Sequence, residues 1–136
     1  MAETKTTQNI LVVEDEAYLR DLYVQILEKE GYIVDQAADG DEAYMKLSKK
    51  HYDLVLLDII LPKMDGLQVL DKFKAESKEV TSPIVLLTNL SQDLVISKAV
   101  GYGVRGYIVK SDVTPEEILV EVKGYIENKP GKTSLS

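Results

Sequence analysis

Acidic residues follow two of the most apolar segments of this chain. Asp58 comes directly after the run 54–57, and the pair Glu14-Asp15 comes directly after the run 10–13. Short, continuous apolar runs are typical of strands that are buried on both faces of a parallel sheet. The carboxyl ends of such strands form the crevice in which open α/β sheets bind ligands. We therefore expect these carboxylates to meet at one edge of a sheet.

This set of residue types favours phosphoryl transfer assisted by a metal. Converging carboxylates repel one another, and a hard, oxygen-binding cation such as Mg²⁺ relieves the repulsion. Two further apolar runs, 84–87 and 107–109, are followed by Thr88 and Lys110. A nucleophile, a metal, a hydroxyl and an ammonium are the groups that the transfer of a phosphoryl group requires.

The elements that must position these residues alternate along the chain. We expect strands at 10–13, 33–35, 54–57, 84–87 and 107–109, and helices near 17–29, 42–49, 67–76, 92–100 and 116–128. The last helix has a clear start signal, in which Thr114 and Glu117 form a capping box around Pro115. Because parallel strands need crossover helices, the alternation predicts an α/β fold, a doubly wound parallel sheet of five strands.

Length, charge and cysteine content exclude several classes of function. A chain of 136 residues is the size of one domain. Its net charge of −7 argues against nonspecific nucleic-acid binding and against attachment to an anionic membrane. Cysteine is absent, which rules out disulfides and thiolate sites, and no apolar run approaches the length of a membrane span. We expect a cytoplasmic protein without membrane insertion.

Four motifs together resemble the receiver domains of two-component response regulators. They are ILVVEDE (10–16), DIILPKMDG (58–66), LLT (86–88) and GYIVK (106–110), and their order and spacing also match. The resemblance implies a flavodoxin-like (βα)5 sheet with strand order 2-1-3-4-5. It divides the chain into a disordered or frayed N-terminus (1–8), a receiver domain (9–128) and a flexible C-terminal tail (129–136).

The resemblance also implies a role for each site residue. Asp58 would accept a phosphoryl group from a histidine kinase or a histidine phosphotransfer protein. Mg²⁺ would be bound by Asp58 and Asp15 directly, by Glu14 through water and by the backbone carbonyl of Ile60. Lys110 and Thr88 would bind the phosphoryl oxygens. Tyr107 would turn inward when Thr88 moves.

Four positions depart from the pattern of the family. Asn89 replaces the small residue that usually follows the threonine, and Ser111 replaces a proline that usually follows a cis bond. A cis bond before a residue other than proline costs about 3 kcal/mol, so the Lys110-Ser111 bond is either trans or strained. Ile60 and Leu90 flank the path of the water that would hydrolyse the aspartyl phosphate. Because both side chains are apolar, we expect slow self-dephosphorylation.

The output is expected to be a change in protein contacts. No DNA-binding domain could follow Asn128 in this sequence, so we expect a downstream protein target or a phosphorylation-linked dimer. The contact face would combine the fourth helix, the fifth strand and the fifth helix, near Leu94, Val95, Ile96 and Tyr107.

Other functions remain as alternatives. One is a receiver-like scaffold that works without phosphorylation. Another is a phosphatase with an aspartate nucleophile, which is disfavoured because Ile60 stands where such enzymes carry a second acid. The match of 101–106 to G-x-G-x-x-G is rejected as a dinucleotide site, because it follows a predicted helix and precedes a strand.

Overall fold

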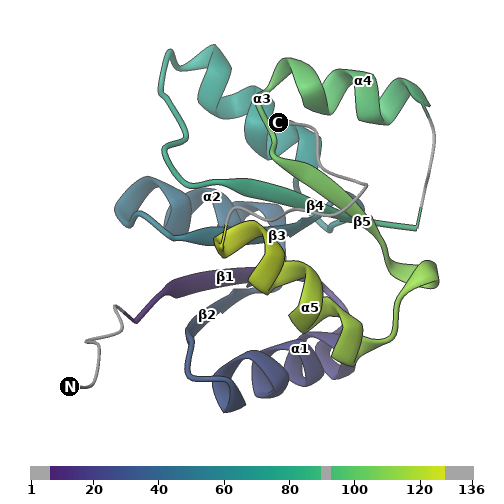
Figure 1. Cartoon of the computed structure of the whole chain (residues 1–136). Coiled ribbons are helices and arrows are strands. Elements are labelled where there is room, and N and C mark those ends of the chain that lie inside the picture. Colours follow the sequence, from purple (N-terminus) through teal and green to yellow (C-terminus); the bar gives the residue numbers. More distant parts are fainter. Residues whose placement is uncertain (1–6, 90–92, 128–136) are drawn as a thin grey trace.

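Five strands and five helices alternate along the part of the chain that the computed structural model describes, residues 7–89 and 93–127 (Figure 1). The strands are β1 (Asn9–Val13), β2 (Ile33–Ala37), β3 (Leu54–Asp58), β4 (Ile84–Thr88) and β5 (Gly106–Val109). The helices are α1 (Ala17–Lys29), α2 (Gly40–Lys49), α3 (Gly66–Ala75), α4 (Asp93–Gly101) and α5 (Pro115–Ile126), with a 3₁₀ turn, η1 (Lys110–Asp112), after β5. The expected tail at 129–136, most of the expected frayed start and Leu90 lie outside the described residues.

The strands form one parallel sheet in the order β2-β1-β3-β4-β5, which confirms the predicted fold. Residues of β1 alternate between the two faces: Leu11 and Val13 pack with α2, α3 and α4, while Ile10 and Val12 pack with α1 and α5. Figure 1 shows the same two layers of helices on either side of the sheet. Both faces are therefore buried, which explains why the strands are continuously apolar.

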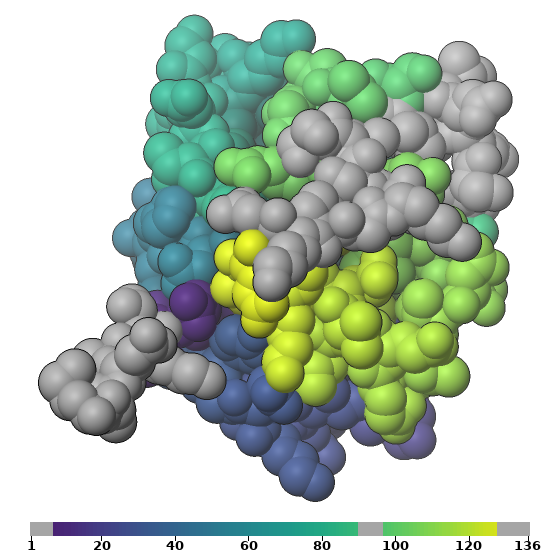
Figure 2. All heavy atoms as spheres, viewed as in Figure 1, coloured from purple at the N-terminus to yellow at the C-terminus, as the bar shows by residue number. Residues whose placement is uncertain are grey.

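The helices α1 and α5 lie side by side on their face of the sheet. Their atoms are in contact across the molecular surface in Figure 2, where α1 is blue and α5 is yellow. At the ends of the two helices, Lys123 Nζ lies 2.6 Å from Glu30 Oε2. The opposite ends of both helices lie at the carboxyl edge of the sheet, because α1 follows β1 and α5 follows β5 and η1.

Side-chain caps set the starts of three helices. The predicted capping box of α5 is present: Thr114 Oγ1 accepts from Glu117 N at 3.2 Å, and Glu117 Oε1 accepts from Thr114 N at 2.8 Å. Asp65 and Gln68 form an equivalent box at α3. At α2, Asp39 accepts from Glu42 N, so the helix begins two residues before the start expected from its apolar pattern.

The connection after β5 resolves one open expectation. No peptide bond among the described residues is cis, so the Lys110-Ser111 bond is trans. Lys110 instead begins the 3₁₀ turn η1, which leads into α5. Within the described residues, no helix combines the length and the apolar character that crossing a membrane requires.

Candidate functional site

Three carboxylates converge at the carboxyl edge of the sheet. Oxygen atoms of Glu14, Asp15 and Asp58 all lie within 4.8 Å of one another. The adjacent strands β1 and β3 bring them together, since Val13 is in register with Leu57. Glu14 and Asp58 are only 1% and 3% exposed, whereas Asp15 is exposed to solvent. One side of the cluster is therefore open to a cation or a substrate.

Lys110 bridges the two buried carboxylates. Its Nζ lies 2.7 Å from Asp58 Oδ2 and 2.9 Å from Glu14 Oε1, and its side chain is 14% exposed. Burial acts to lower the pKa of Lys110, but the hydrogen bonds to Asp58 and Glu14 outweigh it and raise the pKa above its ordinary value. The ammonium therefore stays charged at neutral pH and offsets the repulsion between the two acids.

Backbone amides bind the remaining oxygens of these two carboxylates. Glu14 Oε2 accepts from Glu16 N at 3.0 Å, and Asp58 Oδ1 accepts from Ile60 N at 3.2 Å. In each carboxylate, one oxygen thus accepts a hydrogen bond from Lys110 and the other accepts one from a backbone amide. Such charge-assisted bonds fix both side chains in place.

The other predicted site residues lie on the neighbouring strands. Thr88 is buried at the end of β4, where Leu87 pairs with Asp58. Tyr107 is half-buried on β5 and packs against the apolar cluster beneath α4. Asn89 is exposed, and Ile60 is 62% exposed directly beyond Asp58.

Tyr23 is a neighbour of the site that the sequence did not reveal. It is buried on α1, and burial raises its pKa to about 12; Lys110 acts to lower this pKa, while Glu14 and Asp58 raise it further. Tyr23, Val24 and Leu27 form the buried side of α1. The proximity of Tyr23 to the acids depends on how α1 crosses the sheet, which periodicity does not encode.

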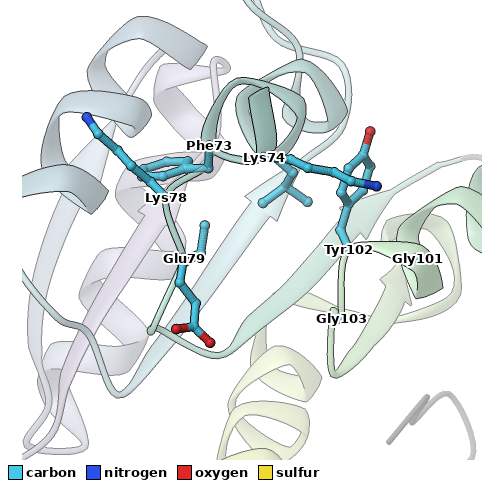
Figure 3. A pocket seen from close by; sticks show the side chains of 9 residues that line it. Phe73, Lys74, Lys78, Glu79, Gly101, Tyr102 and Gly103 are labelled. Carbon is cyan, nitrogen blue, oxygen red and sulfur yellow. The ribbon is translucent and has the colours of Figure 1, made fainter. Parts of the chain in front are cut away.

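One hollow of the molecule is lined by none of the residues of this cluster. It has a volume of about 420 Å³ and is lined by α3 and by the segments that follow α3 and α4, including Phe73, Lys74, Lys78 and Tyr102 (Figure 3). Glu79 is the single carboxylate among its lining residues. The acids of the sheet edge therefore form a separate site.

A doubly wound sheet with acids and a lysine at its carboxyl edge defines a class of ligand-binding α/β domains. Within that class, the family model of the response regulator receiver domain matches residues 10–123. The chain belongs to this family. Receiver domains are signalling domains, switched by phosphorylation with a histidine kinase as partner, and they generally bind Mg²⁺ at their acidic pocket.

Similar proteins include longer regulators and single receiver domains. The chain is 36% identical over 126 residues to the transcriptional regulatory protein ResD of Bacillus subtilis (strain 168), covering 93% of this chain and 50% of that protein. It is 34% identical over 127 residues to the transcriptional regulatory protein SrrA of Staphylococcus aureus (strain NCTC 8325 / PS 47), covering 93% and 51%. The chain thus spans about half the length of these curated relatives.

Solved structures of receiver domains superpose on most of the chain. A CheY-like receiver domain protein from Methanospirillum hungatei JF-1 has a TM-score of 0.78 at 30% identity, covering 91% of this chain and 97% of that one. The chemotaxis response regulator CheY4 of Vibrio cholerae has a TM-score of 0.77 at 28% identity, covering 88% and 99%.

Proposed function

We propose that Asp58 is the phosphoryl acceptor of this receiver domain, which spans residues 9–128. The observation that carries the proposal is the position of Asp58, which is buried at the carboxyl end of β3, 2.7 Å from Lys110 Nζ and close to two further carboxylates. A carboxylate oxygen of Asp58 would attack the phosphorus of a phosphohistidine on a histidine kinase or a histidine phosphotransfer protein. The P–N bond would break, and its electron pair would stay on the imidazole nitrogen.

The donor set fits Mg²⁺, a hard cation that prefers oxygen ligands. Asp15 and Asp58 would bind the ion directly, and the backbone carbonyl of Ile60 would add a ligand. Glu14, whose oxygens accept from Lys110 and from Glu16 N, would act through water. When bound, Mg²⁺ supplies positive charge for the oxygens of the transferring phosphoryl group.

Phosphorylation would act on Lys110 and Thr88 and change the surface beyond them. The new group carries a charge of roughly −1.5 to −2 and strong acceptor oxygens, which the ammonium and the hydroxyl would bind. Tyr107 would turn inward as Thr88 moves, and the face of α4, β5 and α5 would change its contacts with a downstream protein or a second copy of the chain. On α5, the apolar side chain of Val120 is exposed.

We propose protein rather than nucleic acid as the direct target of this domain, since the net charge of the whole chain is −7.

Incubation with acetyl phosphate and Mg²⁺ should add one phosphoryl group to the protein. The addition should disappear in Asp58→Asn, because an amide is a poor nucleophile, and should fall strongly in EDTA. Intact-mass measurement checks all three results. If neither protein gained a phosphoryl group, the result would favour a receiver-like scaffold that works without phosphorylation.

The aspartyl phosphate should decay slowly, since the exposed apolar side chain of Ile60 cannot orient a hydrolytic water. Ile60→Asn, combined with Leu90→Glu, should accelerate the decay severalfold, as followed by intact mass after removal of acetyl phosphate. Ile60→Leu is the matched control and should decay like the parent. Equal decay of all variants would exclude this explanation of the lifetime.

A further inference from the structure

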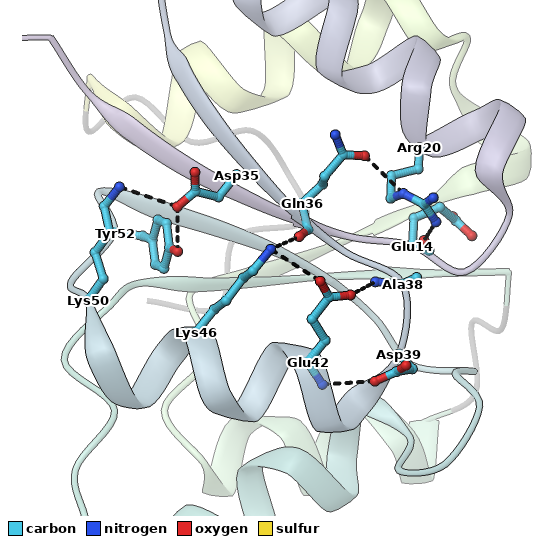
Figure 4. A network of polar contacts seen from close by, with 10 residues as sticks. All are labelled: Glu14, Arg20, Asp35, Gln36, Ala38, Asp39, Glu42, Lys46, Lys50 and Tyr52. Atoms are coloured by element: carbon cyan, nitrogen blue, oxygen red, sulfur yellow. Dashed lines mark hydrogen bonds and ion pairs between the residues drawn. The ribbon is translucent and has the colours of Figure 1, made fainter.

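Arg20 on α1 holds the backbone of the loop that carries two of the three carboxylates. Its Nη1 donates to the carbonyl oxygen of Glu14 at 2.8 Å (Figure 4). The same Nη1 reaches the carbonyl oxygen of Asp15 at 3.5 Å. The first is a strong hydrogen bond from a charged donor, and the second is a longer contact. The guanidinium therefore binds the main chain of both residues while leaving their side chains free for the site.

Arg20 is itself anchored to the neighbouring strand. Its Nε donates to Gln36 Oε1 on β2 at 3.0 Å. The backbone carbonyl of Gln36 accepts from Lys46, whose ammonium lies 3.3 Å from Glu42 Oε2, and Glu42 Oε1 accepts from Ala38 N at 2.8 Å. Figure 4 shows these contacts as a continuous network from Glu14 to α2. Arg20 thus ties the loop to the edge strand β2.

The start of α1 gives the loop little other support. Glu16 occupies the N-cap position, and among the described residues its side chain makes no capping hydrogen bond. Two further hydrogen bonds hold the loop: Glu14 N donates to Ala37 O at 3.1 Å, and Glu16 N donates to Glu14 Oε2. The second of these bonds uses a carboxylate of the site itself. Arg20 adds a side-chain contact to the carbonyl oxygens of the loop that, like the bond to Ala37, does not use the carboxylates.

We propose that Arg20 is a positioning residue for the metal site, holding Glu14 and Asp15 where they can bind Mg²⁺ together with Asp58. This inference rests on the proposed metal site. The positive charge of Arg20 works in the opposite direction, because it repels a cation, but charge effects near the surface are weakened by solvent and salt. Residues that orient metal ligands from outside the ligand set typically contribute 10- to 100-fold to affinity.

Isothermal titration of Mg²⁺ into the metal-free protein tests the proposal. Arg20→Gln and Arg20→Lys should each weaken binding by roughly tenfold, since neither side chain can bind the loop and Gln36 together. Gln36→Leu should weaken it less, because it removes the anchor alone. Arg105→Gln removes the same charge from an exposed residue beside β5 and should leave the affinity unchanged. Thermal unfolding without Mg²⁺ separates a change in affinity from a loss of fold.

Each other outcome would overturn the inference. If Arg20→Gln bound Mg²⁺ as tightly as the parent or more tightly, charge rather than positioning would be the role of Arg20. If Arg20→Lys bound Mg²⁺ as tightly as the parent, a guanidinium that binds the loop and Gln36 together would not be needed. If an Arg20 variant failed to fold, unchanged affinity in Gln36→Leu would still contradict the proposal. A parent protein that bound no Mg²⁺ would overturn the metal site and this inference together.

Discussion

Replacing Lys110 with methionine should lower the free energy of unfolding by about 3 kcal/mol at pH 7 in EDTA. The variant keeps most of the side-chain volume but leaves Glu14 and Asp58 buried beside each other without the cation that bridges them. Removing one partner of a buried ionic network costs more than the network itself contributes, because the remaining charges are left without compensation. Denaturant unfolding followed by circular dichroism measures the loss.

Conditions that reduce the repulsion between Glu14 and Asp58 should restore part of the free energy of unfolding lost in Lys110→Met. Mg²⁺ should restore part of the stability. The double variant Lys110→Met/Glu14→Gln should also be more stable than the single one. Lys63→Met is the control: its ammonium lies 3.5 Å from Asp39 with a side chain 63% exposed, and its loss should cost less than about 1 kcal/mol. Equal losses in Lys110→Met and Lys63→Met would contradict the bridging role.

Gly66→Ala should both destabilise the protein and slow phosphorylation. A Cβ at Gly66 would lie 2.4 Å from the carbonyl oxygen of Asp58 and 3.0 Å from the Cα of Ile59. Both are backbone atoms, so relief requires the end of β3 to move, at a cost of about 2 kcal/mol or more. Because the same movement displaces Asp58, the rate of phosphoryl addition should fall as well. Denaturant unfolding and the initial rate with acetyl phosphate provide the two measurements.

Gly101→Ala is the matched control for Gly66→Ala. A Cβ at Gly101 meets no atom within 4 Å, and this glycine is the last residue of α4. Alanine favours helix over glycine by up to about 1 kcal/mol, so this variant should be neutral or slightly more stable. A loss as large as that of Gly66→Ala would show that steric contact with β3 is not the cause.

The sequence predicts the elements of this fold well because its strands are apolar on both faces. It places Asp58, Glu14 and Asp15 at strand ends, and the sheet order then brings them together. The end of β2 is harder to predict, because Asp35 and Gln36 lie on an edge strand and break the apolar run. The capping box of Asp65 and Gln68 has the sequence pattern D-x-x-Q, but no apolar periodicity marks these two residues as the start of a helix.

The support around the site is less visible in the sequence than the acids themselves. Arg20 reads as an ordinary polar position of a helix, and its two contacts depend on the crossing of α1 over β1 and β2. The closeness of Gly66 to Asp58 likewise arises from the path of the loop between β3 and α3. Such contacts join residues whose spacing follows no periodic rule, so they emerge only in three dimensions.

Location of the phosphoryl group on the chain tests the central proposal most directly. Borohydride reduces an aspartyl phosphate to homoserine, so the protein would be treated with acetyl phosphate and Mg²⁺, reduced, digested and sequenced by mass spectrometry. Our account predicts homoserine at position 58 and at no other aspartate, with none in the sample without Mg²⁺. Homoserine at Asp15 instead, or at no position in a protein that had gained a phosphoryl group, would contradict the assignment of Asp58 as the acceptor.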